Sequence, residues 1–466
     1  MKYIQATIEV LNPEEEQMVH DASMTILNQI GIHMPEKRVL ERFKVAGAQV
    51  DWDMQIVRIP EKLVWAVLEN VREADSGTAE QRAISALEIT LTPQPFITDY
   101  PGKTRRNGIL EDVVKGVLIS NRMRYLKEAD PIVVPGDVPA PVSDLYSYKA
   151  LYQYANKPGN AYINSEWSAA YLFEMAATLN QNVKYLIEPV SPLRFTEEHL
   201  RLAWLFAEHG QVISIGPMVI AGLSGPVTLA GTLAIQNAEI LASIVLVYLL
   251  RANCCYRYSG GALTMDMRTM LCSFGSPNQA LLVLAEKQMA RRYRLPCLGA
   301  LALSDSNFPD FQAGFEKGSS VAISALAGVK WVGNQGHVGA DQAASLEQMV
   351  IDDEWADHLN YLLRGFEVTE DTLALDVIRE VGIGGSFIST EHAGRHARSN
   401  YWKSDLFSRV SWESWTREGN TTIYDRANAK VKKILSEDYP PAPRISEDLV
   451  KELDRIIASA CSEIDH

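Results

Sequence analysis

The sequence predicts a (β/α)8 TIM barrel with an N-terminal helical cap and a C-terminal helical extension. Between residues 96 and 333 it contains eight short apolar or β-rich runs, and a helical segment can be drawn after each of them. Eight strand–helix units in series are what a parallel barrel needs, whereas a doubly wound sheet usually has about five to seven strands. The 466 residues are 47% hydrophobic and 22% charged, which suits one large domain with appended elements.

Residues 1–94 are expected to form the cap. Asn12, with Pro13 at the first helical position and Glu15 three residues on, predicts the start of an amphipathic helix. The stretch "AQVDWDMQIVRIP" holds two short alternating runs about Asp53 and predicts a hairpin. Two further helices are expected near residues 36–46 and 60–71.

Residues 95–370 are expected to form the barrel. Its strands are expected at residues 96–98, 132–134, 161–164, 185–188, 212–215, 255–259, 297–303 and 330–333. Its helices are expected near residues 111–127, 142–155, 167–180, 196–209, 226–251, 277–292, 311–328 and 341–364. The extension, residues 371–466, ends in a helix near 446–460 that we expect to serve as a packing element or as a contact in a homo-oligomer.

Composition excludes several classes of protein. A net charge of -14 disfavours nucleic-acid binding, which needs a basic face to displace counterions. The N-terminus has no secretory signal pattern, and the longest apolar run, "ILASIVLVYLL", is about half the ~20 residues that cross a bilayer, so we expect a cytoplasmic protein with a buried core helix and no membrane contact. Five cysteines without a CxxC pair predict neither a disulfide framework nor a structural zinc site.

Polar residues just beyond the predicted strands are the candidates for an active site, because the loops after the strands form the catalytic face of a barrel. The residues at these positions are Asp99, Tyr100, Gly136, Asp137, Ser165, Glu166, Glu188, Gly216, Pro217, Tyr258, Ser259, Ser304, Asp305, Asn307, Asn334, Gln335 and His337.

The stretch "LSDSNFPDFQAGFEKG" follows the seventh strand. Asp305 is either a catalytic carboxylate or a residue that simply ends the strand, and Asp310 is expected to cap the helix that starts near Phe311. His337 lies among glycines that let the backbone approach a ligand, and Asp341 is one helical turn later, where it can orient the ring.

Two other features contain residue types that are typical of ligand sites. His392 and His396 have the i, i+4 spacing of zinc ligands, but no third ligand is evident and two arginines are adjacent, so a surface or interface role is favoured and no bound metal is predicted. Aromatic rings at Tyr100, Tyr258 and Phe308 lie at or near strand ends. Rings around a carboxylate hold quaternary ammonium groups by cation–π attraction of about 0.5–2 kcal/mol each.

Three long stretches resemble the trimethylamine methyltransferase (MttB) superfamily. They are "LSGPVTLAGTLAIQNAEILA" (223–242), "SDSNFPDFQAGFEK" (304–317) and "EVGIGGSFISTEHAGRHARSNYW" (380–402). The N-terminal segments "ILNQIGIHM" and "AGAQVDWDMQIVRIPEKLV" also fit, so the resemblance covers nearly the whole chain.

The resemblance implies a TIM-barrel enzyme that passes a methyl group from a methylated amine to the cobalt(I) of a corrinoid held by a separate partner protein. Founding members carry pyrrolysine, whereas this sequence contains only standard residues. Similar proteins without pyrrolysine act on quaternary amines such as glycine betaine, proline betaine, carnitine or γ-butyrobetaine, and this is the substrate class we expect. Dealkylation of a quaternary ammonium releases a neutral amine, so the leaving group needs no proton.

Strand-end position and the resemblance together define the expected site. Asp305 and His337 are the catalytic candidates. The substrate-binding candidates are Tyr100, Tyr258, Phe308, Gln335, Glu166 and Gln312. A betaine also carries a carboxylate, and because residues 298–314 contain no basic side chain, Arg257 or backbone amides are expected to bind it.

Two other functions remain open at this stage. A TIM barrel also supports lyases such as decarboxylases or aldolases, although an aldolase would need a lysine within a strand and Lys330 is the single candidate. A betaine sensor would bind the amine but would not transfer its methyl group to a corrinoid.

Overall fold

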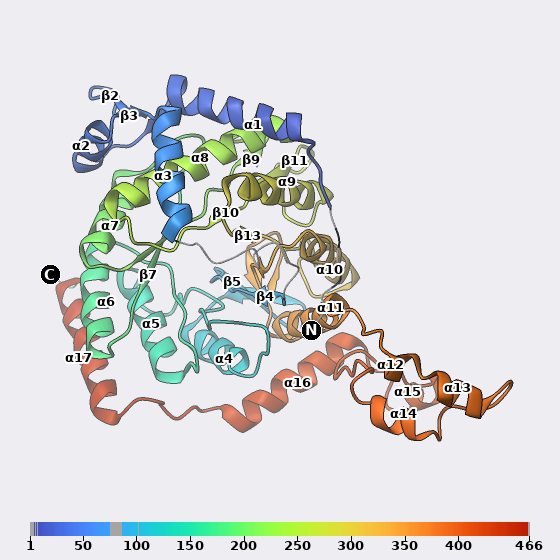
Figure 1. Ribbon diagram of the computed structural model, residues 1–466. Helices are drawn as coiled ribbons and strands as arrows, with labels where there is room; N and C mark the ends of the chain where they lie inside the picture. Colours follow the sequence, from blue (N-terminus) through green and yellow to red (C-terminus); the bar gives the residue numbers. More distant parts are fainter. Residues whose placement is uncertain (1–3, 5, 7, 75–85, 101, 465–466) are drawn as a thin grey trace.

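The computed structural model describes residues 4, 6, 8–74, 86–100 and 102–464, and they form a mixed α/β fold. Short strands lie near the centre and are surrounded by a ring of helices, while an arm of small helices projects from one side (Figure 1). From residue 184 onward strands and helices alternate along the chain, as the sequence predicts, whereas the three helices between residues 110 and 178 have no strand between them.

The N-terminal elements agree with prediction. Helix α1 (Pro13–Thr25) begins with a reciprocal capping box, in which the Asn12 side chain accepts from the Glu15 N–H and the Glu15 carboxylate accepts from the Asn12 N–H. The expected hairpin is confirmed as β2 (Gln49–Asp51) and β3 (Ile56–Arg58), and β1 (Ile32–His33) adds to the antiparallel sheet. The expected helices are α2 (Lys37–Val45) and α3 (Glu61–Ala74).

The central strands run parallel. Strand β7 (Lys184–Ile187) pairs with β8 (Val212–Ile215), and a second sheet has the order β10 (Tyr258–Gly260), β13 (Cys297–Gly299), β14 (Trp331–Val332), β4 (Glu88–Ile89). The N–H of Gly261 donates to the Pro217 carbonyl at 2.9 Å and so links the two sheets. Two isolated parallel bridges add further segments beside β4. Ile89 pairs with Leu126, and Ala129 pairs with Pro158. No single sheet closes through all these segments in the part of the chain that is described.

Two of the eight predicted strands do not form, and a third forms but pairs outside the central sheets. Residues 96–98 belong to β5 (Phe96–Asp99), which pairs antiparallel with β6 (Thr104–Asn107), and β4 takes the place beside β14. Residues 132–134 and 161–164 form no strand. Strand β4 has only two residues, too few to show an alternating pattern, so the sequence did not reveal it.

The helices of the ring were predicted more accurately than the strands. The ring contains α4 (Leu110–Ser120), α5 (Ser143–Tyr154), α6 (Glu166–Thr178), α7 (Glu197–Glu208), α8 (Leu229–Leu250), α9 (Pro277–Tyr293), α10 (Phe311–Leu326) and α11 (Leu346–Leu363). A short 3-10 turn, η3 (Ala140–Val142), precedes α5. Helix α8 is long and apolar enough to cross a membrane, but 78% of its apolar window is buried inside the fold, as expected of a core helix.

Short strands outside the central sheets lie in the loops that follow the parallel strands. Strands β9 (Ile220–Ala221), β11 (Leu263–Asp266) and β12 (Leu271–Ser273) form one small sheet, while β15 (His337–Val338) and β16 (Ala343–Ala344) extend the sheet of β5 and β6. The turn and strands over 337–344 delay the start of α11, which was expected near residue 341.

The C-terminal region has two parts. Helices α12 (Glu370–Leu373), α13 (Leu375–Val381), α14 (Glu391–His396) and α15 (Trp412–Arg417) form the projecting arm. Helix α16 (Ile423–Asp438), which was not predicted, packs on α4 and α11, and the predicted last helix is confirmed as α17 (Glu447–Ile464), which packs on α6 (Figure 1).

Candidate active site

A cavity of about 620 Å³ lies at the centre of the parallel segments. Part of the cavity wall consists of residues with little or no side chain. Four such residues line it, one from each of four neighbouring strands or strand ends: Gly216, Gly261, Ala300 and Gly333. Neighbouring positions on these strands point outward to the helices, as the alternation of a β-strand requires. Small residues on four adjacent segments leave space for a ligand.

Acidic side chains line the same cavity, and the Glu188 carboxylate lies beside Gly216. Glu188 directly follows β7, and its burial, together with the charge of Asp341, raises its pKa to about 7. Burial and then the charges of Glu188 and Asp341 raise the pKa of Tyr162, so these three side chains share one environment. No described residue donates a hydrogen bond to the Glu188 carboxylate. A half-buried, unpaired carboxylate beside a second acid and an aromatic ring is suited to a cation.

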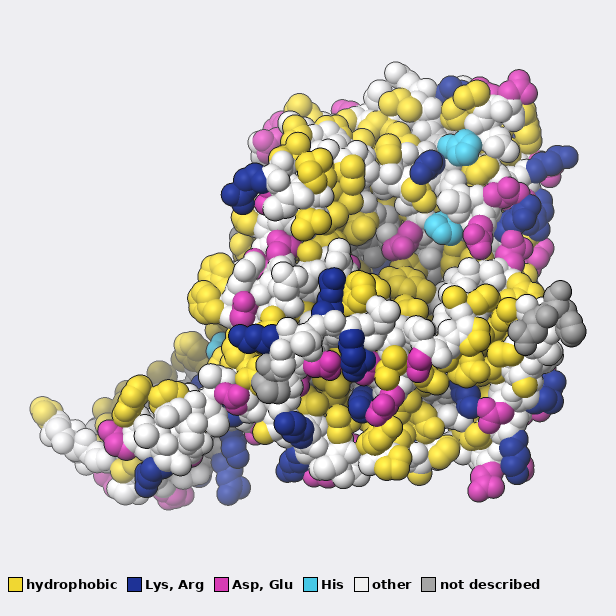
Figure 2. All heavy atoms as spheres, turned by 180° about the vertical axis from the view of Figure 1, so that it is seen from behind, with side chains coloured by type: hydrophobic (Ala, Val, Ile, Leu, Met, Phe, Trp, Pro, Cys, Tyr) yellow, Lys and Arg dark blue, Asp and Glu magenta, His cyan; other side chains and the backbone are white. Residues whose placement is uncertain are grey.

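Asp130 adds a further acid to the cavity wall. Its Oδ1 accepts the backbone N–H of Asn160 at 2.5 Å, and burial raises its pKa to about 8. The space-filling view shows a hollow near the middle of one face, with acidic side chains and a histidine at its edge (Figure 2).

His337 lies behind the cavity and fixes one of its acids. The ring is fully buried, with Nδ1 2.6 Å from Asp341 Oδ1 and Nε2 2.8 Å from the Thr92 carbonyl. Asp341 lines the cavity, whereas His337 does not. Asp341 also has a left-handed backbone, with φ of 59°, so the contact to His337 holds a side chain on a strained turn. The predicted orienting pair is confirmed, but the roles are reversed, because the acid is the member exposed to the cavity.

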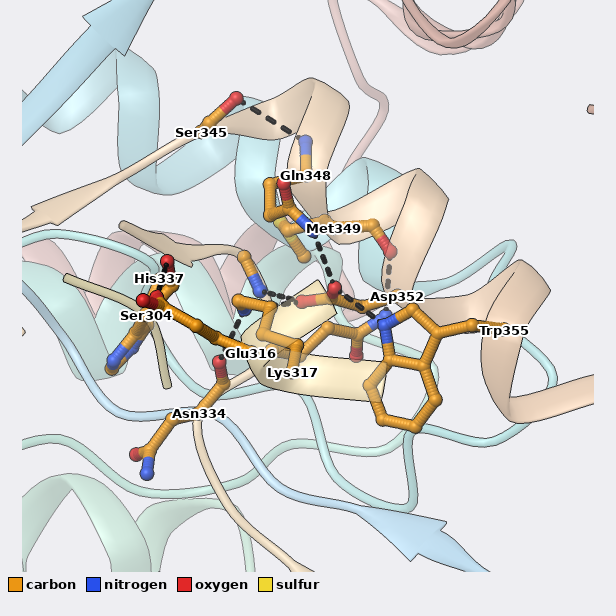
Figure 3. Close-up of polar contacts among 12 residues, drawn as sticks. Ser304, Glu316, Lys317, Asn334, His337, Ser345, Gln348, Met349, Asp352 and Trp355 are labelled. Atoms are coloured by element: carbon orange, nitrogen blue, oxygen red, sulfur yellow. Dashed lines mark hydrogen bonds and ion pairs between the residues drawn. The ribbon is translucent and has the colours of Figure 1, made fainter. Parts of the chain in front are cut away.

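A buried ion pair supports the turn that carries Asn334 (Figure 3). Lys317 Nζ lies 2.8 Å from Asp352 Oδ2, both side chains are fully buried, and Nζ donates to the Asn334 carbonyl at 3.4 Å. Asp352 also accepts from the Gly336 N–H, at 2.7 Å, and from Gln348 and Trp355. Burial lowers the pKa of Lys317. This network fixes the end of β14, where Asn334 has a φ of 76° and lines the cavity.

Asp305 is held away from the cavity. Its carboxylate accepts the Ser273 hydroxyl at 2.8 Å and the Phe274 N–H at 2.7 Å, which ties the loop after β13 to β12. Glu316 holds the same loop, accepting from the Ser304 hydroxyl and the Asp305 N–H. The expected cap is confirmed, since Asp310 accepts the Ala313 N–H at the start of α10. Asp305 therefore organises the loop and does not line the cavity.

The six predicted substrate-binding residues also lie outside the cavity wall. Tyr258 is fully buried and donates to Asn237 at 2.9 Å, and Gln335 is fully buried and donates to the Met349 carbonyl. Both side chains face the helices. The alternation of inward and outward side chains along each strand is shifted by one residue from the alternation expected from the sequence. Tyr100 stacks on Phe308 at 5.7 Å but donates to Asp425 of α16, Glu166 begins α6, and Gln312 is exposed beside Glu316.

Some cavity residues could have been found from the sequence. Glu188, Gly216 and Asn334 are among the strand-end residues, and Arg257 is a residue expected to bind a substrate carboxylate; all four line the cavity. Asp130 was missed because the second parallel segment lies near residues 126–130, earlier in the chain than the strand expected at residues 132–134.

A family model described as trimethylamine methyltransferase (MTTB) matches residues 1–464. The chain belongs to this family. It is a methyltransferase, with the family match extending from the N-terminal cap through the C-terminal helices.

Individual relatives are distant but cover the whole chain. A glycine betaine methyltransferase of Desulfitobacterium hafniense strain Y51 is 29% identical over 475 residues, covering 98% of each chain. A trimethylamine methyltransferase MttB of D. hafniense DCB-2 is 27% identical and covers 92% of this chain and 90% of its own. The solved monomethylamine methyltransferase of Methanosarcina barkeri covers 91% of this chain and 92% of its own, with 11% identity and a TM-score of 0.47.

Proposed function

We propose that this methyltransferase removes a methyl group from a quaternary amine of the betaine type, such as glycine betaine, proline betaine, carnitine or γ-butyrobetaine, and passes it to cobalt(I) of a corrinoid on a separate protein. The acidic wall of the cavity is the observation that carries the proposal. Glycine betaine is also the substrate in the name of the relative that is 29% identical over the full length.

A quaternary ammonium cation suits this wall better than a neutral amine. The cation carries its charge at every pH, and binding beside Glu188 and Asp341 neutralises part of a half-buried negative charge that is otherwise unfavourable. The ring of Tyr162 adds an aromatic face to the same site. A corrinoid is the methyl acceptor in this proposal and not a resident cofactor, so the chain itself needs no metal ligands.

The proposed transfer needs no acid catalyst. The acceptor supplies the electron pair of the new bond to the methyl carbon, the carbon–nitrogen bond breaks, and its electron pair stays on nitrogen, so a neutral tertiary amine leaves. The residues of this chain hold the nitrogen, aim one methyl group at the cavity mouth and exclude water. Glu188 and Asp341 bind the cation, while His337, Lys317 and Asp305 position the loops around it.

Arg257 is our candidate for the carboxylate of a betaine. It lines the cavity, its guanidinium lies 4.5 Å from the centre of the Trp331 ring, and no acidic side chain among the described residues pairs with it. Arg257 precedes Gly261 by four residues, so along the strand direction it enters the cavity about 13 Å from the level of Gly261, Ala300 and Gly333. Substrates with a longer spacer between nitrogen and carboxylate would reach it most easily.

We also infer that the eight parallel segments form a distorted (β/α)8 barrel. The pairing of β14 with β4 brings the last segment next to the first, and the cavity is lined by residues from all eight. The least regular part is the stretch between residues 126 and 160, where single bridges replace strands. Pro131 and Pro158 lie in this stretch and have no N–H to donate to a ladder.

The test is methyl transfer to a cobalt(I) corrinoid protein from a panel of quaternary and tertiary amines, followed by the visible spectrum of the cobalt. We expect transfer from at least one betaine and none from trimethylamine. Glu188→Gln should reduce transfer, and Glu198→Gln is the control because Glu198 lines the cavity from the exposed start of α7. Activity with trimethylamine alone would contradict the proposed substrate class, and binding without transfer would indicate a sensor.

A further inference from the structure

The apolar helix α8 contains three fully buried polar side chains that the proposed chemistry does not use. They are Gln236, Asn237 and Glu239, and Glu239 is the only charged residue in this helix of 22 residues. The hydrogen-bond partners of Glu239 among the described residues are neutral groups. Burying a carboxylate without a cation is unfavourable, and burial raises the pKa of Glu239. The stability of a core helix therefore does not explain this residue.

Glu239 holds the loop that follows β7. Its Oε2 accepts the Ser191 hydroxyl at 2.7 Å, and its Oε1 accepts the Leu193 N–H at 2.7 Å. Leu193 has a left-handed backbone, with φ of 55°, which is unfavourable for a residue other than glycine. The carboxylate thus fixes a strained turn at two points. The first of these points is three residues after Glu188, the acid that lines the cavity.

The same face of α8 holds the loop that follows β8. Gln236 is three residues before Glu239, so the two side chains lie on one face of the helix. The Gln236 amide donates to the Pro217 carbonyl at 2.9 Å and accepts the Val219 N–H at 3.0 Å. Pro217 directly follows Gly216 of the cavity wall. This face of α8 therefore contacts two neighbouring loops that carry cavity residues.

Asn237 lies between these two residues in the sequence but binds other parts of the fold. Its amide donates to Ser23 of α1 at 2.8 Å and to Tyr293 of α9 at 2.9 Å, and it accepts the Tyr258 hydroxyl at 2.9 Å. None of these three partners lines the cavity. Asn237 is as buried as Glu239 and has more hydrogen bonds, so it provides a control for a purely structural role.

We propose that Glu239 is a positioning residue for methyl transfer, because it fixes the loop after β7 and thereby the place of the Glu188 carboxylate in the cavity. The inference rests on the proposed function, in which Glu188 binds the substrate cation. His199 holds the start of the loop, with Nδ1 3.0 Å from the Glu188 carbonyl, and Glu239 holds the turn that follows. Without Glu239 the turn relaxes and the Glu188 carboxylate moves toward water.

Release of the loop should change the ionisation of Glu188. Burial and the charge of Asp341 raise its pKa to about 7, so a carboxylate that moves toward water should titrate closer to its usual value of 4.5. The other titratable groups in this part of the cavity are Asp130, Tyr162, Tyr185, Glu198 and His199. None of them is a hydrogen-bond partner of Glu239, so substitution of Glu239 removes no hydrogen bond from them.

Carbon-13 NMR of the free protein, labelled at the glutamate carboxyl carbon, measures the pKa of Glu188 without a substrate, and Glu188→Gln identifies its signal. Glu239→Ala should move the titration midpoint to lower pH by about one unit or more. Glu239→Gln should leave it near the wild-type value, because the new amide can accept the Leu193 N–H and donate to the Ser191 oxygen. Asn237→Ala should destabilise the protein in urea and leave the midpoint unchanged.

Steady-state kinetics with the best betaine donor provides a second readout. Glu239→Ala should raise KM several-fold and lower kcat less, and the midpoint of the kcat/KM profile should shift to lower pH as well. If Glu239→Ala does not fold, Ser191→Ala removes one of the two contacts from a partly exposed residue and should give a smaller shift in the same direction.

An unchanged Glu188 midpoint in Glu239→Ala would overturn the proposal, as would an unchanged midpoint in Ser191→Ala if the first variant does not fold. An equal shift in Asn237→Ala would also overturn it, because any loosening of the core would then have the same effect. The expected shift in a protein that demethylates no betaine would support the positioning of Glu188 and contradict the proposed substrate class.

Discussion

At the scale of single residues, the ionisation of Glu188 should make substrate binding in the cavity depend on pH. Its pKa is raised to about 7, and a cationic substrate prefers the ionised form, so kcat/KM should rise with pH between 6 and 8. Glu188→Gln should raise KM for a betaine about tenfold, equivalent to ~1.4 kcal/mol, and flatten the pH profile. Steady-state kinetics across this range checks both. An unchanged profile in the variant would show that another group controls binding.

The contact between His337 and Asp341 predicts non-additive substitutions. His337→Ala should raise KM more than it lowers kcat, because it releases Asp341 from its position in the cavity wall. Asp341→Asn should have a similar effect, and the double variant should be little worse than either single one, with a coupling energy of about 1–3 kcal/mol. Fully additive effects would mean that the two residues act independently.

At the scale of elements, the ion pair between α10 and α11 should be important for stability. Lys317→Met leaves Asp352 charged and buried, and breaking such a pair costs about 3–5 kcal/mol of unfolding free energy. Lys317→Met combined with Asp352→Leu should recover part of this loss. Urea denaturation measures both variants. A single variant within about 1 kcal/mol of the wild type would show that the pair contributes little to the support of β14.

Helices and strands differed in how far they could be predicted. The ring helices and α1 have eleven or more residues, and their apolar spacing and caps are visible in the sequence, as at Asn12 and Asp310. The parallel strands have two to four residues, too short for a periodic signal, so β4 was missed and Tyr258 was assigned to the wrong face. The sequence still identified Glu188 as a site candidate. Recognising that a residue lies at the end of a strand does not require knowing which face of the strand each side chain is on.

At the scale of the whole molecule, three acids whose pKa is raised make stability depend on pH. Burial raises the pKa of Glu188 to about 7 and those of Asp130 and Glu286 to about 8. Each carboxyl group binds its proton more tightly when folded, so the stability it contributes is present at low pH and is lost as pH rises through these values. Burial lowers the pKa of His20 from its usual value of 6.5. Its titration therefore affects stability only below about pH 6.5 and does not overlap with that of the three acids.

We therefore expect the free energy of unfolding to fall by a few kcal/mol between about pH 6.5 and 8.5. Denaturation midpoints at several pH values measure this. A variant with Gln at positions 188 and 286 and Asn at 130 should show a flatter dependence. Stability that increases over this range would contradict the assignment of these acids as protonated in the folded state.

The most direct test of the central claim is a crystal structure of the protein with glycine betaine bound. The acidic wall predicts that the trimethylammonium nitrogen lies in the central cavity, near the carboxylates of Glu188 and Asp341 and within about 6 Å of the Tyr162 ring centre. A ligand bound outside this cavity, or bound with its carboxylate against Glu188 and Asp341, would contradict the claim.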